Sequence, residues 1–184
     1  MTEVHEERME FGADREQKEA IWRKRAIRLA SRASTETTAG DDVRVLVFAI
    51  GAERYAVELT SVASVLAPVV STPVPGAPAA VAGIIAVNGE IRPVLDLRRM
   101  LGMEPRGNAD VPAPVVLLHR KGRQLGLLAD RVEQIRSIRR DACRPTGEGG
   151  LPARFVESLT DDTLLLLKPE ALFQELLRGE EAAG

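Results

Sequence analysis

The sequence predicts an all-β protein made of two similar β-barrel subdomains, with short helices and an N-terminal amphipathic helix. Short runs of β-branched and aliphatic residues follow one another from residue 43 onward, separated by turn-forming residues. The order strand, turn, strand, short helix occurs twice, in residues 81–101 and 155–177. Barrel closure would remove the unpaired edges that so many short strands otherwise expose.

The composition is that of a folded protein and excludes several functional classes. Apolar residues make up 45% of the 184 residues, which is enough for a core. Aromatic residues make up 3% and the net charge is −2, so neither a base-stacking surface nor a basic field for nucleic acid is expected. Cys143 is the single cysteine, which rules out an intramolecular disulfide. With no signal-peptide pattern and no apolar run of membrane-spanning length, we expect a cytoplasmic protein without direct membrane insertion.

Residues 1–42 form a predicted N-terminal extension that differs from the rest of the chain. Within it, apolar residues recur at helical spacing, and basic residues fill the other faces. The apolar stripe contains Trp22, Ala26, Leu29 and Ala33. We interpret this segment as a docking helix for a partner or for the domain itself. Its basic face leaves membrane or nucleic-acid binding as an alternative.

The first strands are predicted between residues 43 and 66. Residues 43–50 and 55–59 are rich in β-forming residues and are separated by Gly51-Ala52-Glu53-Arg54, which predicts a hairpin. Residues 60–66 fit either a further short strand or a helical turn. Prolines then mark an extended connection, because proline lacks a backbone donor and disfavours a preceding helix. They stand at positions 68, 73, 75 and 78.

The clearest local signal is a hairpin in the middle of the chain. Residues 81–87 and 90–97 are apolar runs separated by Asn88-Gly89, the dipeptide that favours a type I′ turn. Pro93 indicates that its strand has an unpaired side at that point. Residues 96–101 then predict a short helix, and Gly102 is a suitable stop.

A second three-stranded unit follows a polar loop. Residues 115–119 and 124–129 predict two strands joined by the turn Lys121-Gly122-Arg123. Residues 130–138 continue as a strand with a bulge, because their apolar positions do not alternate strictly. Residues 139–152 are predicted to be a loop.

The last unit repeats the middle one. Residues 155–159 and 163–167 predict two strands, and residues 169–177 a short helix with Pro169 in its first turn. We therefore expect a domain of two intertwined barrels over residues 43–178, followed by a tail over 179–184.

The residue types needed for catalysis or metal binding are scarce. His119 and Cys143 are the only candidates for a nucleophile–base pair in the globular part, and we interpret them as a surface histidine and an isolated thiol. Histidine and cysteine are too few for an ordinary zinc site. Asp161-Asp162 lacks the ligand alternation of a calcium loop and fits a turn. We expect no catalytic residue, no metal and no cofactor.

The stretch from Gly83 to Arg98, with Asn88-Gly89 at its centre and Asp96-Leu97-Arg98 at its end, resembles the signature of CheW-like domains, the bacterial chemosensory adaptors. The resemblance extends over residues 43–177 and includes Tyr55-Ala56-Val57 and the leucine run at 164–167. It implies two five-stranded SH3-like barrels packed through a shared apolar interface, and no catalysis.

The resemblance also implies two partners. One is the regulatory domain of a CheA-type histidine kinase, and the other is the cytoplasmic tip of a chemoreceptor. The implied kinase-binding residues are Val62, Ser64, Val65 and Leu66, and the implied receptor-binding residues are Ala86, Val87, Asn88 and Gly89. The purely structural alternatives are that Val62 and Val65 fill a barrel and that Asn88-Gly89 serves only as a turn.

The chain departs from the family pattern at both implied surfaces. Family members usually read Asn-Leu-Arg-Gly where this chain has Ala86-Val87-Asn88-Gly89, so Asn88 replaces a long cation. Ser64 stands where an acidic residue is common, and Lys168 where an aspartate is usual. These differences predict a divergent adaptor that has lost one of its two interfaces. The alternative function is an SH3-like module that binds a protein or peptide outside receptor signalling.

Overall fold

The computed structural model describes residues 42–104, 106, 111–146 and 150–182. The expected N-terminal helix lies outside these residues. The first half contains β1 (Asp42–Ile50), β2 (Glu53–Glu58), the 3₁₀ turn η1 (Leu59–Ser61), β3 (Val62–Val69), β4 (Val81–Val87), β5 (Glu90–Leu95) and α2 (Leu97–Met100). The second half contains β6 (Ala113–Arg120), β7 (Arg123–Leu128), β8 (Arg131–Arg139), η2 (Arg140–Ala142), β9 (Arg144–Pro145), α3 (Gly150–Phe155), β10 (Val156–Leu159), β11 (Leu164–Leu167) and α4 (Pro169–Ala182).

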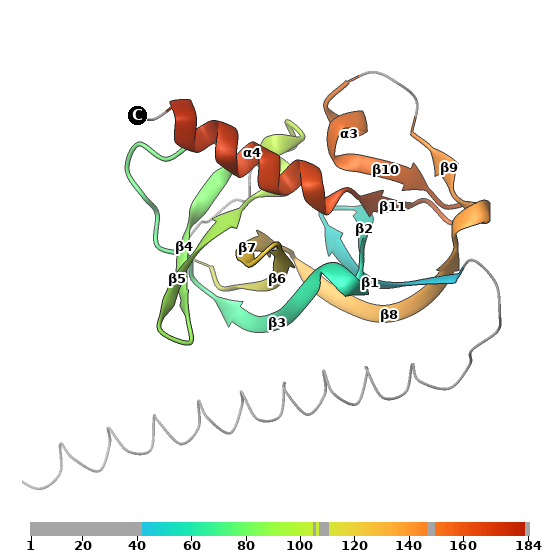
Figure 1. The fold of residues 1–184 in the computed structure, drawn as a ribbon, viewed down its shortest axis with the longest axis horizontal. Coiled ribbons are helices and arrows are strands. Elements are labelled where there is room, and N and C mark those ends of the chain that lie inside the picture. The colour runs from blue at the N-terminus through green and yellow to red at the C-terminus, as the bar shows by residue number, and fades with distance from the viewer. Residues whose placement is uncertain (1–41, 105, 107–110, 147–149, 183–184) are drawn as a thin grey trace, which may run out of the picture. The chain divides into compact units, whose positions relative to one another are not determined.

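The strands form two sheets that follow one plan (Figure 1). The first, here called barrel A, has the order β8-β1-β2-β11-β10-β9, and the second, barrel B, has the order β3-β6-β7-β5-β4. Each contains a central antiparallel hairpin, β1–β2 or β6–β7, and one parallel pair, β2–β11 or β7–β5. The predicted all-β class with two barrels is confirmed, and barrel A has the short strand β9 in addition.

The two barrels exchange strands. β3 follows β2 along the chain but pairs with β6 of barrel B, and β8 follows β7 but pairs with β1 of barrel A. The β1–β8 ladder shifts its register between Val47 and Phe48, which confirms the bulge predicted in residues 130–138. Because each barrel takes a strand from the other half of the chain, neither barrel is a contiguous piece of sequence.

A shared core lies between the barrels, and it explains why several strands are apolar on both faces. In β1, Leu46, Phe48 and Ile50 contribute to the shared core, whereas Val45 and Val47 contribute to the interior of barrel A. β6 alternates in the same way, with Val115 in the interior of barrel B and with Val116 and Leu118 in the shared core. The shared core also takes side chains from α2, α3 and α4.

The turns follow the local chemistry of the sequence. Asn88 and Gly89 have φ angles of 52° and 81°, so they form the predicted type I′ turn between β4 and β5. Gly102, with φ of 66°, follows α2 as the expected stop, and α4 begins at Pro169. Pro93 pairs with β4, while the ladder to β7 starts only at Val94, which agrees with an unpaired side at the proline.

Three local expectations need correction or completion. The segment 60–66 resolves into both alternatives, since η1 precedes β3. The predicted loop 139–152 contains η2, β9 and the start of α3, and Pro152 in the first turn of α3 was an available signal for that helix. The closing helix α4 runs to Ala182 instead of residue 177, because Glu180, Glu181 and Ala182 are good helix formers, so part of the expected tail is helical.

Candidate protein-docking surfaces

The residues expected to bind a kinase lie on β3, at one edge of barrel B. Val62, Ser64, Val65 and Leu66 are all half-buried. Val62 and Val65 pack against the shared core, and Leu66 packs against the interior of barrel B. Val62, Val65 and Leu66 therefore contribute to packing, as the purely structural alternative holds. Their side chains also remain partly accessible to solvent.

The free edge of β3 is unusual in its chemistry. Within the described residues, β3 forms a ladder only with β6. None of its eight residues is charged, whereas β8, its counterpart in barrel A, carries four charged residues among nine. Charged side chains protect exposed strand edges from other strands, so the edge of β8 is protected and the edge of β3 is open to a partner. The lack of charge over residues 62–69 was a signal that the sequence already contained.

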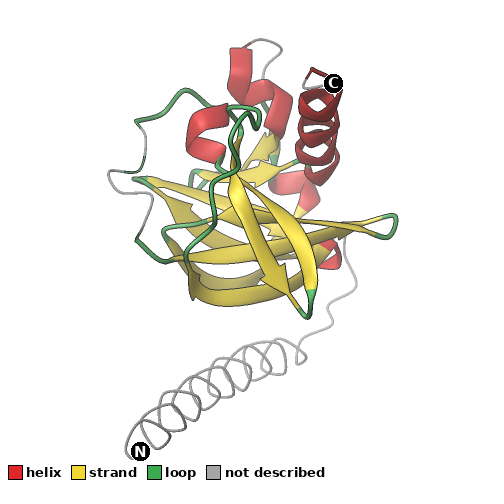
Figure 2. Cartoon of the chain, turned by 90° about the vertical axis from the view of Figure 1, so that its left-hand side faces the viewer, coloured by secondary structure: helices red, strands yellow, loops and turns green. Residues whose placement is uncertain are grey.

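The residues expected to bind a receptor form the tip of the β4–β5 hairpin, on the opposite edge of barrel B. Ala86, Asn88 and Gly89 are exposed, and Val87 is half-buried. Ile91 pairs across the hairpin with Ala86, and 66% of its surface is exposed. In Figure 2 hairpin tips, drawn in green, extend beyond the yellow strands of the sheets. The hairpin thus presents an apolar patch beside its turn, and Ile91 is a member that the sequence reading missed.

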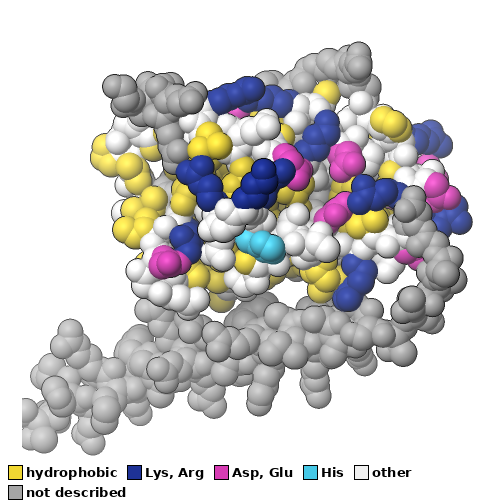
Figure 3. Space-filling view, in the orientation of Figure 1, with side chains coloured by type: hydrophobic (Ala, Val, Ile, Leu, Met, Phe, Trp, Pro, Cys, Tyr) yellow, Lys and Arg dark blue, Asp and Glu magenta, His cyan; other side chains and the backbone are white. Residues whose placement is uncertain are grey.

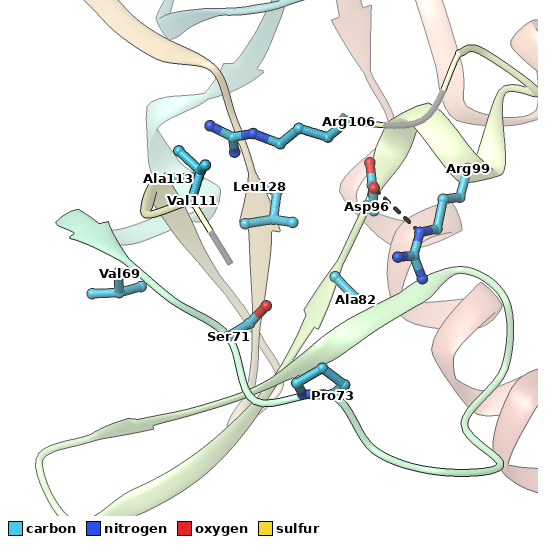
Figure 4. Close-up of a pocket in the computed structure, with 10 residues that line it drawn as sticks. All are labelled: Val69, Ser71, Pro73, Ala82, Asp96, Arg99, Arg106, Val111, Ala113 and Leu128. Carbon is cyan, nitrogen blue, oxygen red and sulfur yellow. Dashed lines mark ion pairs between the residues drawn. The ribbon is translucent and has the colours of Figure 1, made fainter. Parts of the chain in front are cut away.

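A pocket opens at the mouth of barrel B (Figure 4). Aliphatic residues of β3, β4 and β7 line it together with two arginines, Arg99 and Arg106. Arg99 pairs with the buried Asp96, with 3.4 Å between Nε and Oδ2. Val111, which is 48% exposed, lies at the same pocket. The lining suits the side chains of a protein partner, because it combines apolar surface with guanidinium donors.

The end of the signature segment holds the two barrels together. Asp96 caps α2 by accepting a hydrogen bond from the Arg98 backbone N–H at 3.0 Å, and Leu97 is fully buried. The Arg98 guanidinium pairs with Asp130, whose carboxylate also accepts the Gly51 N–H at 2.6 Å. This contact joins α2 to the β1–β2 turn of barrel A. Asp96, Leu97 and Arg98 are thus structural.

The surroundings of Asp130 favour its charged form. Burial raises the pKa of its carboxyl, but the Gly51 N–H and the Arg98 guanidinium outweigh burial and lower the pKa below its usual value. The sequence reading assigned Asp130 no role. Its partners lie 79 and 32 residues away along the chain, so no local pattern connects them.

The remaining candidates separate in space or serve the fold. His119 is the penultimate residue of β6 in barrel B, whereas Cys143 packs against the interior of barrel A, with its Sγ 3.4 Å from the Arg139 carbonyl oxygen. Asp162 accepts hydrogen bonds from Arg136 at 2.6 Å and from the Thr160 hydroxyl, which lower its pKa to about 2. It serves the β10–β11 turn. The predicted docking-helix residues Trp22, Ala26, Leu29 and Ala33 lie outside the described residues.

Over the described ranges, no group of three or more His, Cys, Asp or Glu side chains is placed to hold a metal ion. None of the helices described combines the length and the apolar character needed to cross a membrane.

Comparison with known proteins agrees with this geometry. The CheW-like domain family model matches residues 44–177. A probable chemotaxis protein CheW from Rhizobium etli is 30% identical over 141 residues, which cover 73% of this chain and 89% of that protein. The chemotaxis protein CheW of Rhizobium meliloti is 29% identical over 102 residues, which cover 55% of this chain and 65% of that protein.

A solved structure gives the same result. The crystal structure of the scaffolding protein TtCheW from Thermoanaerobacter tengcongensis matches with a TM-score of 0.60 and 28% identity. The match covers 68% of this chain and 88% of that one. The order of the strands, the signature segment and the family match lead to one conclusion: this chain belongs to the CheW-like domain family.

Proposed function

We propose that this chain is a non-catalytic chemosensory adaptor that couples chemoreceptors to a CheA-type histidine kinase in the cytoplasm. The observation that carries the proposal is a CheW-like fold whose barrel B leaves both edges and an apolar pocket mouth accessible. Its chemotaxis relatives and the scaffolding protein with the same fold support it. We assign the adaptor domain to residues 43–178.

We assign the kinase-binding surface to β3. An uncharged, half-buried strand with a free edge fits an apolar barrel-to-barrel contact, and Ser64 adds no charge that would oppose it. The partner would be the regulatory domain of the kinase, and Val62, Val65 and Leu66 would supply the apolar contact.

Ser64→Arg tests this surface, because it places a cation on the open edge. Ser137→Arg is the matched control, since Ser137 is exposed on β8, the equivalent edge of barrel A. We expect Ser64→Arg to weaken kinase binding about tenfold or more, because desolvating an unpaired charge at an apolar contact is costly. The control should change the affinity less than about twofold. Equal effects of the two variants would remove the kinase assignment from β3.

We assign the receptor-binding surface to the β4–β5 tip, where Ala86, Val87 and Ile91 offer apolar contacts and Asn88-Gly89 forms the turn. An amphipathic helix placed against such a patch is a common recognition mode. Asn88 suits φ of 52° but lacks the long cation that the family usually has here.

Asn88→Arg restores that cation. We expect stronger binding to at least one partner in calorimetric titrations with the purified kinase domain and the receptor tip. The substitution should also lower stability by about 1 kcal/mol, because a left-handed conformation disfavours a long side chain. Ser137→Arg, on β8 of barrel A, is the control, because it adds the same charge at an exposed position without a positive φ. Unchanged affinity for both partners would show that the receptor surface is misplaced.

The alternative, an SH3-like module outside receptor signalling, has the same fold and makes a different prediction. Such a module would bind neither the kinase domain nor the receptor tip. Titration of the unaltered protein with each partner separately decides between the two functions, and binding to one partner alone would show that one interface is lost.

A further inference from the structure

The β6–β7 hairpin ends in His119-Arg120-Lys121-Gly122-Arg123, a sequence with three cations and a histidine in five residues. His119, Lys121 and Arg123 are exposed, and Arg120 is half-buried. In Figure 3, dark blue Lys and Arg side chains lie near the cyan histidine on this face, together with magenta Asp and Glu side chains. We call residues 119–123 the basic hairpin.

The turn of the basic hairpin is unfavourable for lysine. Lys121 and Gly122 have φ angles of 46° and 77°, so Lys121 occupies the first central position of a type I′ turn. Asparagine, aspartate and glycine are preferred there, and the β4–β5 turn has Asn88. In the described part of the chain, the Lys121 side chain has no hydrogen-bond or ion-pair partner. A residue that opposes its local backbone preference and gains no contact within the fold indicates a role outside it.

The neighbours of the basic hairpin give its surface a mixed charge. Arg120 pairs with Glu170 at the start of α4. Arg92 donates from Nε to the Gln124 side chain at 3.0 Å and pairs with Glu90. Gln124 is the cross-strand partner of His119, so this pair lies next to the hairpin. The cations of the hairpin are therefore flanked by two carboxylates, Glu90 and Glu170.

We propose that the basic hairpin binds a carboxylate-rich segment of a partner protein, as a third contact of the adaptor beside β3 and the β4–β5 tip. The flanking Glu90 and Glu170 repel a uniformly anionic membrane surface or a nucleic-acid backbone. A protein segment can place its carboxylates beside Lys121 and away from Glu90 and Glu170. The identity of the segment as part of the kinase or the receptor rests on the proposed function.

The test uses the full chain with Lys121→Asn, which keeps a residue suited to the turn and removes the charge. We expect affinity for one of the two partners to fall about fivefold at low salt, and the melting temperature to stay equal or rise. Lys121→Glu should weaken the same complex about tenfold or more. The difference in affinity between the Lys121 variants and the unaltered protein should decrease as salt is raised to about 0.5 M, because exposed charges are screened.

Arg144→Glu is the matched control, since Arg144 is 81% exposed on β9 of barrel A and the charge change is the same. It should change the affinity less than about twofold. If the unaltered protein binds normally and neither Lys121 variant changes the affinity, the proposed role of the basic hairpin is wrong. The proposed adaptor function would not be affected by this result.

If the unaltered protein binds neither partner, the adaptor function fails, and a ten-residue peptide of alternating Glu and Leu tests the hairpin by itself. Perturbation of the NMR signals of residues 119–123 by this peptide, reduced in Lys121→Asn, would support the proposal, and no perturbation would overturn it. A parallel experiment measures binding of the protein to vesicles that contain one-third phosphatidylserine. Binding to them that depends on Lys121 while the peptide has no effect would assign the surface to a membrane and contradict the proposal.

Discussion

Among the described residues, the interior cluster of barrel A contains six buried side chains, whereas that of barrel B contains three, Ile85, Val94 and Val115. The remaining interior residues of barrel B, among them Leu66 and Val69, are only partly buried. Four of the five exposed large apolar side chains in the described residues also belong to segments of barrel B or to the connections next to them. These are Val70, Val74, Ile91 and Val111.

The two barrels also differ in the contacts that connect their edges. Barrel A is braced by ion pairs from β2 and β8, in which Arg54 contacts Glu133 at 3.0 Å and Arg136 contacts Asp162 at 2.6 Å. In barrel B, an isolated antiparallel bridge between Thr72 and Ile84 connects the segment after β3 to β4. The comparison shows that the interior of barrel A is more fully buried and that barrel B leaves more apolar surface exposed.

The largest expected effect compares one substitution in the two interiors. Leu166→Ala in barrel A, where the leucine is 2% exposed, should lower the free energy of unfolding by about 3 kcal/mol, because it leaves a cavity. Leu66→Ala in barrel B should cost about 1 kcal/mol, because that side chain is partly solvated already. Urea denaturation of both variants measures the difference. Equal losses would mean that barrel B is packed as tightly as barrel A.

A smaller effect concerns the closure of barrel B. A Cβ added to Gly83 would lie 2.4 Å from the Thr72 carbonyl oxygen, so Gly83→Ala should cost about 2 kcal/mol and break the bridge. Hydrogen exchange at the Thr72 and Ile84 amides, which both donate at 2.9 Å, should then become faster.

Gly89→Ala separates strain from crowding. Gly89 has φ of 81° and nothing within 4 Å of an added Cβ, so only the backbone preference opposes alanine, at about 1 kcal/mol. Equal losses of stability for the two glycine variants would show that the contact with Thr72 relaxes freely and does not close the barrel.

The last of these effects concerns the link between the barrels. Asp130→Asn should cost about 1 kcal/mol at pH 7, because it weakens charge-assisted hydrogen bonds to Gly51 and Arg98. Since the folded pKa of Asp130 is below the unfolded one, its contribution is present above the unfolded pKa and is lost as the pH falls through the folded pKa. The difference in stability between the two proteins should therefore narrow in melting curves taken below the usual pKa of an aspartate carboxyl. If the difference in stability between the two proteins stays constant with pH, the charge of Asp130 does not contribute to the link between the barrels.

Local signals in the sequence predicted the elements well wherever backbone chemistry decides the structure. Asn88-Gly89 fixed its hairpin, and Pro169 marked the start of α4. The two-residue β9 was missed because pairing with β10, and not its own composition, makes it a strand.

The exchange of strands between the barrels was not derivable from local pattern. The strand-forming character of residues 62–69 is the same whether β3 returns to β2 or crosses to β6, so only the global packing decides. The implied kinase-binding residues lie on β3 and the implied receptor-binding residues lie at the β4–β5 tip, on the two edges of barrel B. The link from Arg98 through Asp130 to Gly51 was not predictable because it joins segments distant in sequence.

The central claim is that barrel B carries the binding and barrel A supports it. The most direct test is hydrogen exchange followed by mass spectrometry on the unaltered protein, alone and saturated with the kinase regulatory domain or the receptor tip. We predict new protection in β3 and in the β4–β5 hairpin, with little change in β8 and β9. Protection confined to β8 and β9, with β3 and β4–β5 unchanged in both complexes, would contradict the account.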